Sequence, residues 1–196
     1  MGEALQTTHL TAEAYFDWEA HNEIRHEYYR GEVFAMAGGT LNHNELIGNM
    51  RRLLEDEFRR RGCRVFAENV KLEVLRNEYY PYPDVMVTCH GMDQRERYVV
   101  RYPSVLVEVI SKNSDYQDRV FKWERYQQLP SLQYYLLVSQ YEPKVEIYGR
   151  TDEPNFWTYQ VYDTPEQMVE LSRLEYSFPL SALYENIEFL APESND

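Results

Sequence analysis

The chain has 196 residues, with 20 Lys and Arg against 33 Asp and Glu, so its formal net charge is −13. This length fits one domain, and the hydrophobic fraction of 43% with 15% aromatic residues excludes a disordered chain. The acidic balance excludes a protein that coats nucleic acid through bulk positive charge, although it allows a local basic groove. We expect a single domain over residues 1–196.

The sequence also bears on where the protein works. Its best apolar run, Tyr134–Val138, is far shorter than the ~18 residues that a membrane span needs. The N-terminus, beginning Met1-Gly2-Glu3, has neither the basic start nor the apolar core of a secretory signal. Cys63 and Cys89 lie far apart and are expected to form neither a CxxC pair nor a disulfide framework. The sequence therefore predicts a cytoplasmic protein.

Hydrophobic periodicity and turn residues predict the elements of the N-terminal part of the chain. These are a helix over Leu10–Glu19 capped by Thr11, two strands around Gly31 within Tyr28–Met36, and a long helix that begins at Asn42 or Asn44 and stops at Gly62. The long helix is the clearest of these, because its apolar residues recur every three and four positions.

Strand patterns dominate the rest. The predicted strands are Arg64–Ala67, Val70–Val74, Pro83–Thr88, Ser104–Ile110, Gln133–Ser139, Lys144–Tyr148 and Phe156–Val161, and the predicted helices are Tyr116–Gln128 and Leu180–Tyr184. Pro83–Thr88 and Ser104–Ile110 are continuous apolar runs, typical of strands covered on both faces. The expected fold class is α/β, with a central mixed β-sheet flanked by α-helices.

The segment Arg51–Arg64 holds six arginines in fourteen residues. One interpretation is a solvated helix face with intrahelical ion pairs, such as Glu55 with Arg59. The other is a patch that faces DNA.

Glu108 stands in the middle of the most apolar predicted strand. Alternation places Leu106 and Ile110 on its face, so neither face of that strand is typical of solvent exposure. A buried carboxylate needs a cation, a metal or a shifted pKa. The simpler interpretation is a glutamate at an exposed strand end or one paired with an arginine.

Asp84 stands at the start of a second apolar strand, although a Pro-Asp pair alone is also common in turns. Two carboxylates on neighbouring strands are what a hard divalent cation requires, namely oxygen ligands with room for water. Such an ion lowers the pKa of bound water and polarises a phosphoryl oxygen.

The order Asp84 followed by Glu108-Val109-Ile110-Ser111 resembles the PD-(D/E)XK nuclease superfamily, and most closely its Uma-type restriction endonuclease family. The resemblance covers residues from about 28 to 184. Its further motifs are Gly31-Glu32, His43, Tyr80–Asp84, Asp118–Lys122, Tyr126, Pro130-Ser131-Leu132 and Tyr134–Val138. It implies a restriction-endonuclease-like fold and a DNA endonuclease that depends on Mg²⁺ or Mn²⁺.

The resemblance also implies roles for particular residues. Asp84 and Glu108 would bind the metal together with the backbone carbonyl of Val109. The superfamily's lysine, expected two residues after the acid, is replaced here by Ile110. Lys122 matches the substitute lysine of the Uma-type family, and Lys112 is the nearer alternative; Lys122 could also be a surface lysine paired with Asp118.

His43 and Glu32 are further candidates for the site. His43 could act as a base or touch phosphate, or could simply cap its helix. Glu32 could extend the metal shell or accept from Lys122, or could be exposed. Asp118 and Tyr126 match family positions with supporting roles.

Three functions stay open at this level. The first is a metal-dependent DNA endonuclease, expected to act as a homodimer because two-stranded cutting commonly needs two sites. The second is a catalytically silent nuclease-fold module that binds protein or nucleic acid, which the replaced lysine and the acidic charge favour. The third is a small-molecule phosphate hydrolase.

Overall fold

The computed structural model describes residues 9–36, 38–111 and 114–189. Within these residues a six-stranded mixed sheet forms the centre of the fold, in the order β11-β10-β9-β8-β6-β3. Its strands are β3 (Arg64–Ala67), β6 (Val85–Thr88), β8 (Pro103–Ile110), β9 (Tyr134–Ser139), β10 (Val145–Arg150) and β11 (Trp157–Tyr162). Only β8 and β9 pair in parallel among these neighbours; the other pairs are antiparallel. This is the expected α/β class.

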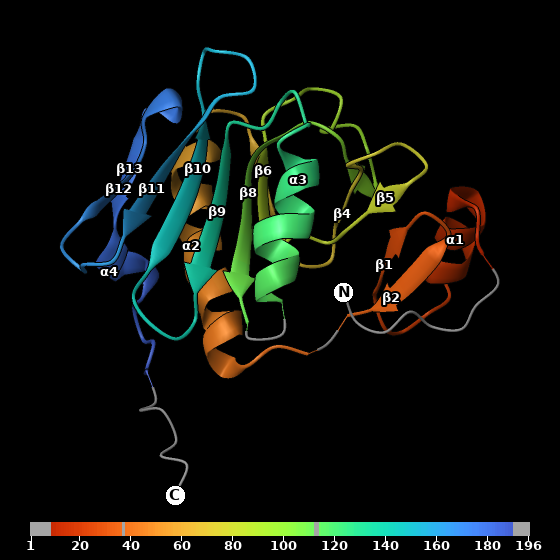
Figure 1. Ribbon diagram of the computed structural model, residues 1–196, viewed down its shortest axis with the longest axis horizontal. Coiled ribbons are helices and arrows are strands. Elements are labelled where there is room, and N and C mark those ends of the chain that lie inside the picture. Colours follow the sequence, from red (N-terminus) through yellow and green to blue (C-terminus); the bar gives the residue numbers. More distant parts are fainter. Residues whose placement is uncertain (1–8, 37, 112–113, 190–196) are drawn as a thin grey trace, which may run out of the picture.

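Helices cover both faces of this sheet, as Figure 1 shows. The helical segments are α1 (Ala12–Glu19), α2 (Leu41–Phe58), η1 (Gln117–Lys122), α3 (Trp123–Tyr126), η2 (Ser172–Leu174) and α4 (Leu180–Leu183). On one face α2 packs on Val85, Val107 and Val109, together with the β12–β13 hairpin (Met168–Leu171 and Tyr176–Pro179) and α4. On the other face α3 packs on alternate residues of the same strands, such as Met86 and Leu106.

A small N-terminal unit packs beside the sheet. It consists of α1 and a second sheet of β1 (His26–Tyr29), β2 (Glu32–Ala35) and β5 (Tyr79–Tyr80). Arg30 and Gly31, both with positive φ, form the two-residue turn between β1 and β2, which is where glycine is favoured. A short parallel pair, β4 (Lys71–Leu72) with β7 (Val99–Val100), completes the strands of the described chain.

Hydrogen bonds of Glu19 help to tie this unit to the main sheet. The carboxylate of Glu19 on α1 accepts from the Tyr82 hydroxyl at 2.8 Å and from the backbone N–H of His26 at 3.0 Å. Tyr82 lies two residues before Asp84, so α1 anchors the segment that leads into β6.

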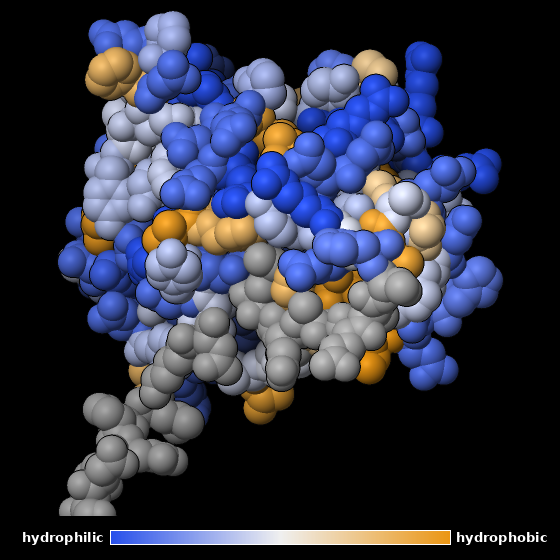
Figure 2. All heavy atoms as spheres, turned by 45° about the vertical axis from the view of Figure 1, so that its right-hand side comes forward, coloured by the Kyte–Doolittle hydropathy of each residue, from blue (hydrophilic) through white to orange (hydrophobic). Residues whose placement is uncertain are grey.

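The face of the molecule drawn in Figure 2 is mostly polar. Hydrophilic residues cover most of the face in Figure 2, with hydrophobic ones in small separate groups. None of the helices in the described ranges has the length and apolar character needed to cross a bilayer.

The predicted elements are confirmed with shifted ends, and the helix starts show why. The long helix is capped by Thr40 rather than by Asn42 or Asn44, because the Thr40 side chain accepts the His43 N–H at 3.1 Å. The predicted helix over Tyr116–Gln128 is partly a π-helix, η1, before it becomes α3. The short strands β5, β7, β12 and β13 were not predicted, because two to four residues carry little periodic signal.

The expectation that the two cysteines form no disulfide framework is wrong. Cys63 and Cys89 form a disulfide across a separation of 26 residues. Arg64 pairs with Thr88 in the β3–β6 ladder, so the residues just outside this pair are cross-strand neighbours. Spacing along the sequence could not reveal this, because the contact depends on the pairing of two strands.

Reduction of this disulfide should lower the free energy of unfolding by about 3 kcal/mol, because the cross-link restricts a loop of intermediate length in the unfolded chain. Urea unfolding of the oxidised and the reduced wild-type protein measures the difference without changing a side chain. A Cys63→Ala/Cys89→Ala variant, which has no disulfide to lose, should show no response to reductant. Equal stability of the oxidised and reduced wild type would contradict the prediction.

Candidate active site

Asp84 and Glu108 lie directly opposite each other on neighbouring strands. The β6–β8 ladder pairs Val85 with Val107, and one further step places Asp84 opposite Glu108. The Asp84 carbonyl accepts the Glu68 N–H at 2.9 Å, so its backbone is directed away from β8. Opposed residues of this kind have Cα atoms about 4.5 Å apart and close side chains. The two carboxylates therefore share one face of the sheet, the face covered by η1 and α3.

The next register position leaves a backbone oxygen beside Asp84. The Val109 N–H donates to Asp84 Oδ2 at 2.7 Å, while the Ile110 carbonyl, on the opposite side of β8, accepts from Gln140 at 3.0 Å. The carbonyl of a strand residue lies on the side of its own N–H, so the Val109 carbonyl is directed toward Asp84.

Glu108 is buried and held by two donors. Its Oε1 accepts from the Tyr126 hydroxyl at 3.0 Å, and its Oε2 lies 2.9 Å from the Lys122 ammonium. Lys122 also lies 3.0 Å from Asp118 Oδ1. The lysine is thus a buried group that directly contacts Glu108, and the interpretation of Lys122 as a surface lysine is wrong, although its pairing with Asp118 is present.

The helical segment η1 brings two charged residues four positions apart into the core together, because residues at this spacing lie on one face of a helix. Asp118 and Lys122 are the buried residues of η1, and both point into the face that carries Glu108. Insertions of π-helix widen a helical turn and occur often at functional sites. The Tyr135 hydroxyl of β9 donates to the Asp118 carbonyl at 3.0 Å, which fixes η1 over the sheet.

Burial and charge shift the pKa values of this cluster. Burial raises the pKa of Glu108 well above its usual value, with Asp118 and Asp84 adding to the rise and Lys122 opposing it. Burial alone would lower the pKa of Lys122, but the carboxylates of Asp118 and Glu108 hold it well above its usual value. Lys122 therefore stays an ammonium, and the carboxylates around it compete for its single charge.

Two residues of the cluster were not predicted from the sequence. Glu27 Oε1 on β1 lies 3.9 Å from Lys122, and burial raises its pKa. Tyr79 on β5 is fully buried, and its hydroxyl has no hydrogen-bond partner among the described residues. Burial and the nearby Glu27 raise the pKa of Tyr79 well above 10, so it remains a neutral donor. Both come from the N-terminal sheet, whose packing the sequence pattern did not indicate.

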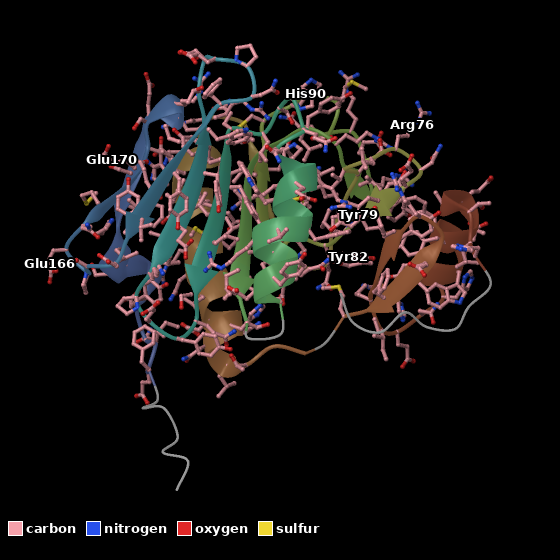
Figure 3. All side chains as sticks on the ribbon, viewed as in Figure 1. Arg76, Tyr79, Tyr82, His90, Glu166 and Glu170 are labelled. Carbon is pink, nitrogen blue, oxygen red and sulfur yellow. A yellow bond between two sulfur atoms is a disulfide. The ribbon has the colours of Figure 1, made fainter. Side chains whose placement is uncertain are left out.

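Figure 3 shows where these segments lie. Tyr79, on β5, and Tyr82 lie between the α3 helix and the β1–β2 hairpin. His90, just after β6, lies at the far end of the main sheet.

His43, from the first turn of α2, reaches the same site. Its Nε2 lies 3.5 Å from Asp84 Oδ2, and the two side chains are 19% and 15% exposed. Burial lowers the pKa of His43, but the hydrogen bond and the charge of Asp84 raise it above its usual value overall. His43 and Asp84 are therefore the more accessible part of the cluster, and Glu108 and Lys122 the buried part.

Two other candidates from the sequence, Glu32 and Lys112, are not among the described residues of this cluster. Glu32 lies on β2 opposite Tyr29, at the turn end of the hairpin, and is exposed. The place beside Lys122 that it was expected to occupy is held by Glu27. Lys112, the alternative lysine, lies outside the described residues.

The arginine-rich segment supports the solvated-helix interpretation. Arg51 on α2 pairs with Glu55 at 3.1 Å, and Arg61, just beyond the end of α2, pairs with Glu57 at 2.6 Å, both at four-residue spacing. The predicted partner for Glu55 was Arg59, so the pairing runs in the other direction along the helix.

A second charge cluster lies on the same face, two strands from Glu108. The ladders place Leu137 beside Glu108 and Glu146 beside Leu137. Arg119 on η1 donates to both Glu146 oxygens, at 2.6 and 2.8 Å, and Tyr159 donates at 2.6 Å. Burial would raise the pKa of Glu146, but these hydrogen bonds lower it to about 2. The negative charge of Glu146 is thus fully compensated, whereas the negative charge of the Glu108 cluster is not.

The oxygen donors of the site are few. In the described part of the chain, no three or more His, Cys, Asp or Glu residues are grouped so as to hold a metal ion. The site offers the two carboxylates and, beside them, the Val109 carbonyl.

Comparison with known proteins places these features in a family. The fold and the site define a restriction-endonuclease-like α/β protein with a carboxylate and lysine cluster at one end of its sheet. The family model Uma2, described as "Putative restriction endonuclease", matches residues 12–182, and the chain belongs to this family.

Relatives and a solved structure agree with this placement. The uncharacterized protein slr1290 of Synechocystis sp. (strain ATCC 27184 / PCC 6803 / Kazusa) is 30% identical over 180 residues, covering 92% of this chain and 94% of that protein. The uncharacterized protein sll1609 of the same strain is 33% identical over 171 residues, covering 86% and 93%. The crystal structure of "a putative nuclease belonging to DUF820 from Anabaena variabilis ATCC 29413" superposes with a TM-score of 0.71 at 15% identity, covering 90% of this chain and 98% of that one.

The Glu146 cluster gives a pH prediction. A pKa of about 2 in the folded protein, below the usual 4.5, means that Glu146 stabilises the fold above pH 4.5 and that this contribution is lost as pH falls toward 2. The advantage of the wild type over Glu146→Gln should shrink by about 2 kcal/mol between pH 6 and pH 3. Urea unfolding at the two pH values measures it. Exposed Glu142→Gln is the control, and a gap between wild type and Glu146→Gln that does not change with pH would refute the pairing.

Proposed function

We propose that this protein is a divalent-metal-dependent endonuclease that hydrolyses phosphodiester bonds of DNA. The observation that carries the proposal is the opposition of Asp84 and Glu108 on adjacent strands, with a buried ammonium, Lys122, in contact with Glu108. Membership in the Uma2 family and the fold of the Anabaena protein support it.

The donor set fits a hard cation. Two carboxylates and one carbonyl, with the remaining positions left to water, suit Mg²⁺ or Mn²⁺ and differ from the nitrogen and sulfur sets typical of zinc. Asp84, Glu108 and the Val109 carbonyl would hold the ion. When bound, it would polarise the phosphoryl oxygen and lower the pKa of a coordinated water.

The chain's own residues have separate tasks in this proposal. The Lys122 ammonium holds the attacking water or stabilises the charge that develops on the phosphate. Asp118 and Glu27 keep that ammonium charged and in place. His43, on the accessible side, touches the phosphate or takes up a proton from the water. The water oxygen bonds to phosphorus, the bond from phosphorus to the leaving sugar oxygen breaks, and that oxygen gains a proton.

Plasmid nicking in Mg²⁺ or Mn²⁺ tests the proposal. Asp84→Asn should reduce nicking at least 100-fold, because it removes a metal-binding charge without changing the size of the side chain. Glu32→Gln, an equally conservative change at the exposed candidate, should leave the rate unchanged. Cutting by Asp84→Asn at the wild-type rate would sink the assignment.

A second candidate function is a catalytically silent module of the same fold. Two observations favour it: both Glu108 oxygens are already held, by Tyr126 and Lys122, and the protein is acidic.

A third candidate, a small-molecule phosphate hydrolase, would turn over a chromogenic phosphodiester and would not cut plasmid. A homodimer, which two-stranded cutting would favour, is tested by sedimentation.

Calorimetry with Mn²⁺ separates the silent module from the enzyme. An enzyme should bind the ion in the wild type and lose most of that heat in Glu108→Gln, which removes one of two charged ligands. Glu146→Gln is the matched control, since Glu146 is similarly buried on the same face but compensated by Arg119. No heat in the wild type, or equal heat in wild type and Glu108→Gln, would favour the silent module.

A further inference from the structure

The His43 ring is confined by the loop that precedes α2. A Cβ atom built on Gly39 would lie 2.8 Å from His43 Nδ1 and 3.2 Å from its Cγ, closer than a Cβ is tolerated. The opposite ring nitrogen, Nε2, faces Asp84 at 3.5 Å. The imidazole is therefore enclosed between the Gly39 backbone and the Asp84 carboxylate.

Backbone conformation does not explain this glycine. The glycines with positive φ in the described chain are Gly31 and Gly62, so Gly39 has a backbone that other residues adopt. Its neighbour Gly38 has nothing within 4 Å of a built Cβ. Gly39 differs from Gly38 in that the His43 imidazole lies against it.

A hydrogen-bonded chain fixes the start of α2 relative to the sheet. The Thr40 hydroxyl accepts the His43 N–H at 3.1 Å and donates to Gln140 Oε1 at 2.6 Å. Gln140 Nε2 donates to the Ile110 carbonyl at 3.0 Å. Each partner dictates the orientation of the next, because a hydroxyl has one proton and an amide has distinct donor and acceptor ends.

These hydrogen bonds lead back along β8 to Asp84 and His43, and so form a closed circuit. Ile110 is bonded along β8 to Val109, whose N–H donates to Asp84 at 2.7 Å, and Asp84 faces His43. Gln140, 4% exposed, is a buried amide whose two ends are both satisfied within this circuit. Buried and fully satisfied polar networks hold their members in one geometry.

We propose that Gly39, Thr40 and Gln140 are positioning residues that hold the His43 imidazole against Asp84, in the orientation it needs to meet the substrate phosphate. This deepens the proposed function and rests on it. None of the three touches the reacting atoms; each acts through the placement of one ring.

The pair Gly39→Ala and Gly38→Ala tests the proposal, because both add one methyl group at neighbouring positions and only the first meets His43. Gly39→Ala should shift the NMR signals of the His43 ring and lower kcat for nicking by about 10- to 100-fold, with KM unchanged. Gly38→Ala should match the wild type in ring signals, kcat and KM. Both variants should keep the wild-type unfolding temperature.

Two results would overturn the proposal. If the His43 ring signals do not move in Gly39→Ala, the positioning role is refuted. This result can be obtained even if the wild type has no nuclease activity, so it is distinguishable from failure of the proposed function. Wild-type kcat in Gly39→Ala, with the ring displaced and the wild type active, also refutes the positioning role.

Thr40 gives an independent check on the hydrogen-bonded chain. Thr40→Ser keeps the hydroxyl and should retain kcat, whereas Thr40→Val should lower it about tenfold and shift the His43 ring signals. If Thr40→Val lowers only the unfolding temperature, with kcat and ring signals unchanged, Thr40 is merely a helix cap and the circuit has no positioning role.

Discussion

The interaction on which the site depends is the compensation of buried negative charge by one ammonium. Glu108, Asp118 and Glu27 all lie within 4 Å of Lys122, and Asp84 stands opposite Glu108. Removing a charge from water costs several kcal/mol per ion, and removing one partner of a buried pair is strongly destabilising. Burial raises the pKa of two of these carboxylates, Glu108 and Glu27, which limits the negative charge that the single ammonium has to balance. Asp84, at the more accessible end of the cluster, faces His43 instead.

This constraint accounts for features of the fold that are otherwise irregular. The helical segment η1, whose buried side carries Asp118 and Lys122, lies on the crossover between β8 and β9. The N-terminal sheet supplies Glu27 and Tyr79, and α1 holds Tyr82 through Glu19, so this unit closes the side of the cluster. The π-helical turns of η1 lie at this cluster, and π-helices occur often at functional sites.

The sequence predicted what depends on local pattern. The central strands, the long helix, and the burial of Glu108 follow from periodicity and from a charge in an apolar run. Glu27 could not be distinguished from Glu32, since both flank the same turn and only the packing of the hairpin decides which one faces Lys122. The disulfide and the Gln140 circuit join residues brought together by strand order alone, over separations of 26 and about 100 residues.

The distribution of charge also constrains how a nucleic acid could be bound. Affinity from counterion release needs many free cations along the contact, but Arg51 on α2 and Arg61, just beyond its end, are engaged with Glu55 and Glu57 of that helix. At the site, His43 lies 3.5 Å from Asp84 and the Lys122 ammonium lies 2.9 Å from Glu108, so both side chains already face carboxylates. Binding of a polyanion to a chain with a net charge of −13 therefore has to rely on local contacts, a bound cation and hydrogen bonds rather than on a broad basic surface.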